Sequence, residues 1–208
     1  MSATNAPFGL RPAYFPTGLE RAQALANGIT SGYGTAILKG QAVQYSPNAG
    51  VILPVLDTTT NSGLVSGAFA GVEWTDTTGR RRVSNYWPAG TTAIAGSIIA
   101  YFYNDQQIVY EIQTDGTMAQ TAIGNEANLS NFTAGSTTTG LSQMTLSASL
   151  VGSGSAGQFR IVDIAPYTDN NWGDAYVIVR VQVSKPQFIS TVNAIYGEMT
   201  NGSSNEKY

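Results

Sequence analysis

The amino-acid sequence predicts a mainly β protein: a β-barrel or β-sandwich of about ten short antiparallel strands, with an extended N-terminal arm and a short C-terminal helix. Three observations lead to this fold class. Glycine (23 residues) and proline (8 residues) interrupt the 208-residue chain at short intervals. The apolar runs between them cover about four to eight residues each, which is the usual length of a strand. Thr, Val, Ile and Tyr are abundant, and these residues fit a half-buried pleated surface.

The chain divides into three parts. Residues 1–16 contain three prolines, which fix φ and favour extended backbone, so they predict an extended arm. Residues 17–185 form the β-rich domain. Residues 186–208 form a C-terminal segment in which apolar residues recur at helical spacing, and a short amphipathic helix or a docked arm fits this pattern. The last few residues are expected to fray.

Within the domain, Thr17–Glu20 matches a capping box, which fits either a two-turn helix or a surface loop. Gly67 and Gly71 mark candidate bulges in one long strand. Four polar residues separate the runs 98–103 and 108–113, which form the clearest predicted hairpin. The expected strands are Thr35–Leu38, Ala42–Tyr45, Val51–Leu56, Leu64–Trp74, Arg81–Tyr86, Ile98–Tyr103, Ile108–Gln113, Gln143–Leu150, Phe159–Ile164 and Ala175–Val183.

The composition excludes several kinds of chemistry. The chain has no histidine and no cysteine, so it can form no disulfide, no thiol nucleophile and no zinc site of the usual kind. Its net charge of −3 argues against nucleic-acid binding, which needs clustered lysine and arginine. The sequence contains no run of 18 apolar residues, so it predicts no membrane-spanning helix. We therefore expect neither nucleic acid nor membrane among its partners.

The surface is expected to be polar but weakly charged. Charged residues make up 11% of the chain, whereas hydrophobic residues make up 42%. Thr, Ser, Asn and Gln together account for 66 residues. Such a surface suits large contact areas, because little charge has to be desolvated when a partner docks.

Motifs that could bind a cofactor or support catalysis have simpler explanations. Gly152–Gly157 matches a dinucleotide-binding pattern, but a strand sequence follows where that motif needs a helix. Asp169–Asp174 offers oxygen ligands for calcium, and an Asx-rich turn has the same composition. The carboxylate pairs Glu111 with Asp115 and Asp163 with Asp174 carry no sign of catalytic pairing. The sequence therefore predicts a protein that is not an enzyme, with no cofactor, no metal and no catalytic residues.

One charge feature stands out. Arg80, Arg81 and Arg82 hold three of the ten basic residues, and in a strand Arg81 would face away from its two neighbours. The triplet is either the solvated end of a hairpin or an anchor for an acidic partner surface. Trp74 and Trp87 lie nearby in sequence, and such aromatic residues suit an interface centre and a β core equally well.

A series of short motifs keeps its order along most of the chain, from Ala6 to Val183. The motifs are Ala6–Pro12, Ser31–Thr35, Gly40–Val43, Gly71–Asp76, Ser84–Thr91, Ile99–Tyr101, Gln113–Gly116, Arg160–Val162 and Gly173–Tyr176. In this series the chain resembles a family of tailed-phage virion structural proteins. The segment Leu19–Thr30 and the residues after Lys185 depart from the family pattern.

The resemblance implies a non-enzymatic head decoration, or cement, protein on the outer surface of the virion capsid. Its expected partners are the major capsid protein and further copies of itself, as a homotrimer or dimer. The alternative is a tail, fibre or host-recognition module that binds surface glycans through an exposed tryptophan, Trp87 or Trp172; a carboxylate-dependent glycan hydrolase ranks third. The candidate partner-binding residues are Phe8, Leu10, Arg11, Tyr14, Phe15, Arg80, Arg81 and Arg82.

Overall fold

The structure is a computed structural model that describes residues 4–15, 18, 21–47, 49–58, 63–152 and 156–188. These residues form a mainly β fold with antiparallel sheets, as the sequence predicts, and their helical content is limited to 3-10 turns, among them η2 (Gln120–Ala122). The strands are β1 (Arg11–Tyr14), β2 (Gln23–Ala26), β3 (Ala42–Tyr45), β4 (Ile52–Pro54), β5 (Gly67–Thr75), β6 (Arg81–Ser84), β7 (Ile99–Tyr103), β8 (Val109–Gln113), β9 (Glu126–Ser130), β10 (Gly135–Ser136), β11 (Leu141–Ser142), β12 (Thr145–Leu150), β13 (Phe159–Ile164) and β14 (Ile178–Val183).

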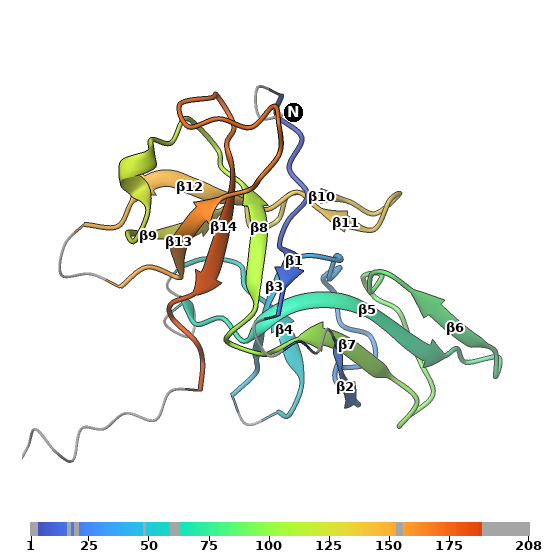
Figure 1. The fold of residues 1–208 in the computed structure, drawn as a ribbon. Helices are drawn as coiled ribbons and strands as arrows, with labels where there is room; N and C mark the ends of the chain where they lie inside the picture. The colour runs from blue at the N-terminus through green and yellow to red at the C-terminus, as the bar shows by residue number, and fades with distance from the viewer. Residues whose placement is uncertain are drawn as a thin grey trace, which may run out of the picture.

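The strands assemble into two six-stranded sheets and a small two-stranded ribbon (Figure 1). The first sheet has the order β1-β8-β14-β13-β9-β12. The second has the order β2-β7-β5-β3-β4, and β6 pairs with the outer part of β5. An isolated bridge joins Leu146 of β12 to Thr114 after β8, and the Ile52 N–H of β4 donates to the Gly28 carbonyl after β2, so these two edge strands are not free along their whole length.

The buried hydrophobic residues form two clusters, and the first also takes in Ala42 of β3 and Ala68 of β5 from the second sheet. The first cluster covers one face of the first sheet and includes Tyr110, Phe159 and Leu146. The second packs Phe69 and Phe102 of the second sheet against side chains from connecting segments, among them Ile37, Ile98 and Trp87. Because both tryptophans near the arginine triplet belong to this second cluster, they serve the core.

The predicted hairpin between the runs 98–103 and 108–113 is wrong. Both runs form strands, but β7 pairs with β2 and β5, whereas β8 pairs with β1 and β14. The burial patterns explain the separation, since β7 alternates between half-buried and buried residues and β8 is buried at every position. A strand buried on both faces has to lie inside a sheet that is covered on both sides.

Two other local predictions are also corrected. The capping box favours a helix or loop before residue 27, yet Gln23–Ala26 forms the edge strand β2 against β7. Thr17, Leu19 and Glu20 lie outside the described residues. The predicted strand Thr35–Leu38 is reduced to one bridge between Ile37 and Trp87. In each case long-range pairing decides the conformation over a weak local signal.

The two candidate bulge glycines have different roles. Pairing between β5 and β7 shifts register between Phe69 and Gly71, which confirms Gly71 as a bulge. At Gly67 a Cβ atom would lie 1.6 Å from the carbonyl oxygen of Tyr103, so glycine permits a close backbone approach there. The predicted C-terminal helix falls almost entirely on residues 189–208, outside the described residues.

Candidate interaction surface

The arginine triplet lies on a hairpin formed by β5 and β6, which extends from the second sheet (Figure 1). The register sets Trp74 opposite Arg82 and Thr75 opposite Arg81. Successive residues of a strand point to opposite faces, so Arg82 shares a face with Trp74 and Arg81 lies on the other face. The hairpin therefore presents arginine on both of its faces.

Asp76 organises the turn of this hairpin. Its Oδ1 atom accepts hydrogen bonds from the backbone N–H groups of Thr78 and Arg80, at 3.0 Å each, and from the Thr78 hydroxyl at 2.6 Å. These bonds hold the pKa of Asp76 well below its ordinary value, and the hydrogen bond from the Thr78 hydroxyl contributes most to that lowering. Gly79 completes the turn with a φ of +84°, a conformation that glycine adopts without strain.

Two of the three arginines form ion pairs along the hairpin. Arg82 Nε donates to Asp76 Oδ2 at 2.9 Å, and Arg81 donates to Glu73. The hydrogen bond from Arg81 is the main reason that the pKa of Glu73 is lowered. The Arg81 and Arg82 side chains are 71% and 52% exposed. Exposed pairs of this kind add little to stability, so the guanidinium groups can exchange partners at small cost.

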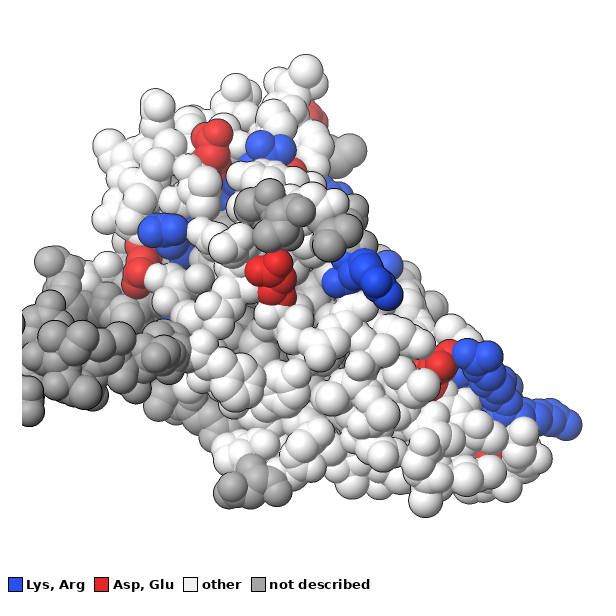
Figure 2. Space-filling view, turned by 60° about the horizontal axis from the view of Figure 1, so that its bottom comes forward, with Lys and Arg blue, Asp and Glu red and all other residues white. Residues whose placement is uncertain are grey.

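The end of the hairpin is the most basic part of an otherwise weakly charged face. Figure 2 shows basic side chains gathered at the lower right of the molecule, where the surface tapers. Arg80, which follows the turn between β5 and β6, is exposed and forms no ion pair among the described residues. Val83 of β6 is 73% exposed, which is the highest exposure among the large hydrophobic residues described. Sequence reasoning missed Val83, because an isolated valine in a strand pattern carries no signal of exposure.

The second set of predicted residues lies on the N-terminal arm, which is fastened to the first sheet. β1 pairs with β8 as an edge strand. Leu10 is buried in the first hydrophobic cluster, and its N–H donates to the Gly40 carbonyl at 2.7 Å. Phe15 is half-buried with its ring 5.9 Å from that of Tyr103. This part of the arm therefore belongs to the folded domain.

Arg11 of the arm belongs to a charged cluster centred on Glu111 of β8. Arg11 donates to Glu111 Oε2 at 2.7 Å, the Tyr167 hydroxyl donates to the same atom at 2.6 Å, and Arg180 Nε lies 3.6 Å from Oε1. Burial favours a raised pKa for Glu111, but the hydrogen bonds from Tyr167 and Arg11 and the two positive charges outweigh it, and the pKa is lowered. These partners lie far from Glu111 along the chain, so no local sequence pattern predicts them.

Aromatic rings surround the two arginines of this cluster. The Arg11 guanidinium lies 4.5 Å from the centre of the Phe8 ring, and that of Arg180 lies 5.6 Å from the centre of the Tyr14 ring. Phe8 and Tyr14 therefore cover a charged seam between arm and sheet. The predicted arm residues thus lie together on the first sheet, while the arginine triplet lies on the second.

Gln113 fastens the arm further toward its start. Its Oε1 accepts the N–H of Ala6 at 2.9 Å, and its Nε2 donates to the carbonyls of Thr4 at 2.9 Å and Tyr176 at 3.4 Å. The arm covers a pocket of about 370 Å³ here, lined by residues that include Phe8, Arg11 and Gln113. The side chains of Arg11, Gln113 and Tyr167 in that lining already bond to the protein, which favours a structural seam over a ligand site.

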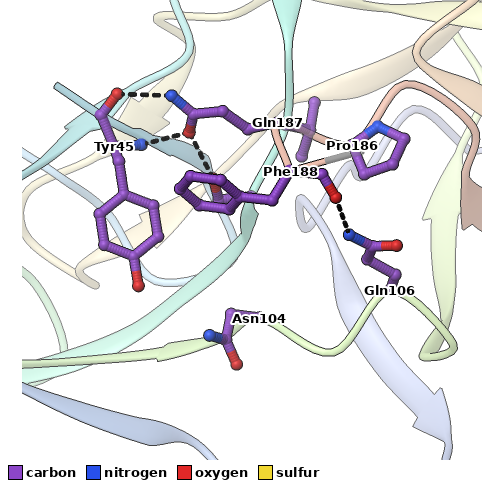
Figure 3. Close-up of a pocket in the computed structure, with 8 residues that line it drawn as sticks. Tyr45, Asn104, Gln106, Pro186, Gln187 and Phe188 are labelled. Carbon is purple, nitrogen blue, oxygen red and sulfur yellow. Dashed lines mark hydrogen bonds between the residues drawn. The ribbon is translucent and has the colours of Figure 1, made fainter. Parts of the chain in front are cut away.

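A second pocket, of about 210 Å³, lies where the chain leaves β14 and crosses to the second sheet (Figure 3). The Gln187 carboxamide enters between Tyr45 and Ser66: its Oε1 accepts from the Tyr45 N–H and the Ser66 hydroxyl, and its Nε2 donates to the Tyr45 carbonyl. Gln106 donates to the Phe188 carbonyl at 2.9 Å. These side chains attach residues 186–188 to the second sheet and leave few donors for a ligand.

Two of the residues considered for metal binding or catalysis, Asn170 and Asp115, bond to other parts of the protein. Asn170 of the Asx-rich loop 169–174 is buried and bonds to the backbone of Ala165 and Ile178. Asp115 accepts from the Ala148 N–H and the Ser130 hydroxyl. Within the described ranges, no group of three or more metal-ligating side chains is present. In the same ranges, no helix has the length and apolar character that a membrane span requires.

The glycan alternative depends on an exposed tryptophan platform, which Trp87 does not supply. Trp87 is fully buried against Trp74, and Trp172 is half-buried against the first cluster. In comparisons with known proteins, the chain matches no family model, no curated protein and no solved structure.

Proposed function

We propose that this chain is a non-enzymatic virion structural protein of a tailed phage, a head decoration protein that binds the outer surface of the assembled capsid. The observation that carries the proposal is the β5–β6 hairpin, where exposed arginines and Val83 extend from a weakly charged β scaffold. Arginine with apolar surface is typical of interface centres. The ordered motifs from Ala6 to Val183 support the same class of protein.

In this proposal the protein stabilises the capsid by linkage. A ligand that binds the assembled lattice more tightly than free subunits shifts the equilibrium toward the assembled shell. Many weak contacts on a symmetric lattice give high avidity, and a homotrimer or dimer on a lattice axis multiplies them further. The major capsid protein is then the partner, and the virion surface is the location.

Co-sedimentation with undecorated phage heads tests the proposal. The purified full chain is titrated to saturation against heads, and the bound amount is measured relative to the coat subunit. We expect saturation at a fixed ratio to the coat subunit, with weaker binding at high salt, because exposed guanidinium groups contribute to the contact. Binding of only a few copies per particle would contradict decoration and would favour a tail location.

A further inference from the structure

The outer edge of β6 has unpaired backbone groups. The Asp76 N–H donates to the Arg80 carbonyl at 2.9 Å, so this pair is hydrogen-bonded across the hairpin. Hydrogen-bonded and non-hydrogen-bonded pairs alternate along an antiparallel ladder. The backbone groups of Arg82 and Ser84 are therefore hydrogen-bonded to their cross-strand partners on β5. The N–H and C=O groups of Arg81 and Val83 point away from β5.

Contacts on the other side of β5 confirm this alternation. The Thr75 carbonyl accepts from the Ile94 N–H at 2.9 Å, and the Thr75 N–H donates to the Ser97 hydroxyl at 3.1 Å. Thr75, the cross-strand partner of Arg81, thus directs its backbone away from β6. Within the described part of the chain, no residue bonds to the outward backbone groups of Arg81 and Val83.

The side chains on this edge select the kind of strand that can pair with it. Arg81 and Val83 lie on one face of the hairpin and Arg82 on the other. An antiparallel partner strand would therefore place, in chain order, an apolar residue opposite Val83 and acidic residues opposite Arg82 and Arg81. Cross-strand pairs of opposite charge and of apolar residues each stabilise a sheet.

The same charges disfavour a second copy of this chain at the edge. Two β6 strands joined edge to edge would bring six arginines together, and like charges on facing strands are destabilising. Charged edge strands prevent pairing with copies in this way. The arginines thus disfavour pairing of β6 with a second copy of itself, while its outward N–H and C=O groups can still pair with an acidic strand.

We propose that β6 docks an extended acidic segment of a partner protein by β-strand addition, with the backbone groups of Arg81 and Val83 forming the new ladder. The inference rests on the proposed function only in taking the capsid as the source of that segment. It adds to that function the chemistry of the contact: main-chain pairing supplies affinity, and the arginines supply selectivity.

A capped synthetic peptide reading Thr-Val-Glu-Glu-Thr serves as the probe, and binding to the full-length protein is followed by NMR. We expect saturable binding that protects the N–H groups of Arg81 and Val83 from exchange. A Thr-Val-Lys-Lys-Thr peptide should not bind. The first peptide N-methylated at its valine and second glutamate, whose N–H groups face β6, should bind at least about tenfold more weakly.

A matched pair of protein variants tests whether the backbone edge of β6 itself binds the peptide. Val83→Pro removes one outward N–H but leaves the bonds of Arg82 and Ser84 to β5, and proline is tolerated on a strand edge. Val83→Thr keeps the N–H and the strand preference. We expect Val83→Pro to lose peptide binding and Val83→Thr to retain it, with both proteins folded by circular dichroism.

Several results would overturn strand addition. Equal binding of the N-methylated peptide would show that charge alone attracts it, and binding unchanged in Val83→Pro would show that the edge is not used. Concentration-dependent protection of the Val83 N–H without peptide would identify a second copy as the occupant. Failure of the peptide to bind at all would also contradict the proposal.

Co-sedimentation with undecorated heads distinguishes this inference from the proposed function. If Val83→Pro saturates heads as the unmodified protein does, decoration stands and strand addition at β6 fails as its contact. If the unmodified protein binds the peptide but not heads, strand addition stands and the capsid is not its source. If Val83→Pro loses head binding while the unmodified protein and Val83→Thr keep it, the result supports both decoration and strand addition.

Discussion

The arm seam on the first sheet and the β5–β6 hairpin on the second both pair arginine with a carboxylate, but in different surroundings. At the seam the Glu111 side chain is only 7% exposed and has two arginines and a tyrosine as partners. On the hairpin Glu73 and Asp76 each pair with one arginine that is mostly in solvent. The same residue types thus form an anchor in one region and an accessible surface in the other.

The difference shows why counting ion pairs does not locate function. A buried carboxylate that loses its partners remains desolvated without compensation, so the seam resists opening. An exposed pair exchanges its partner for water or another charge with little loss. For this reason the hairpin arginines are better suited than Arg11 to bind a second protein, although the sequence ranks both sets as candidates.

The largest expected effect comes from Glu111→Gln. The change removes the buried carboxylate that neutralises Arg180 and the half-exposed Arg11, and we expect it to lower the free energy of unfolding by about 2 kcal/mol. For a chain of this size that corresponds to a fall of roughly 4–8 °C in the unfolding midpoint. Glu73→Gln on the hairpin is the matched control and should leave the midpoint unchanged. Equal effects of the two substitutions would contradict the contrast between seam and hairpin.

Lowering the pH is expected to have a smaller effect on the stability of the protein. Because the pKa of Glu111 in the folded protein lies below its ordinary value near 4.5, its contribution to stability is present above that value and is lost as pH falls through the folded pKa. Urea unfolding of the unmodified protein and of Glu111→Gln should therefore differ most at neutral pH and converge below pH 4.5. A gap that stays constant down to pH 3 would show that the charge of Glu111 is not what stabilises the seam.

The smallest effect on stability is expected from changing Arg80, Arg81 and Arg82 together to serine. Their pairs are exposed, so thermal unfolding should be unchanged within measurement error. Attachment to heads should nevertheless weaken and lose part of its salt dependence. The measurement combines a melting curve with co-sedimentation at low and high salt. Salt dependence that matches the unmodified protein would reduce the triplet to a solvated turn.

The contrast between β7 and β8 shows how far sequence reasoning reaches. Both runs have strand composition and strand length, and both form strands within one residue of the predicted limits. Their partners lie far along the chain, from β1 to β14, and no local pattern identifies them. The region between residues 120 and 157 shows the same limit, since β9 gains its conformation by pairing with β12 and β13.

The candidate surface was predictable to a similar degree. The triplet at positions 80–82 stands out in a chain with few charges, and strand alternation places Arg81 opposite its neighbours, as the register confirms. Val83 and the open backbone of β6 could not be predicted, because exposure depends on whether another strand covers that edge. Leu10 shows the reverse case: it belongs to a predicted arm, and the fold buries it in the core.

By itself, the sequence determined the β class, the positions of most strands and the weakly charged surface, because these follow from local spacing and composition. Tertiary structure alone decided which strands pair, which arginines are anchored and which edge stays open. The physical reason is that strand formation responds to neighbours along the chain, whereas pairing, burial and desolvation depend on residues as far apart as Arg11 and Glu111.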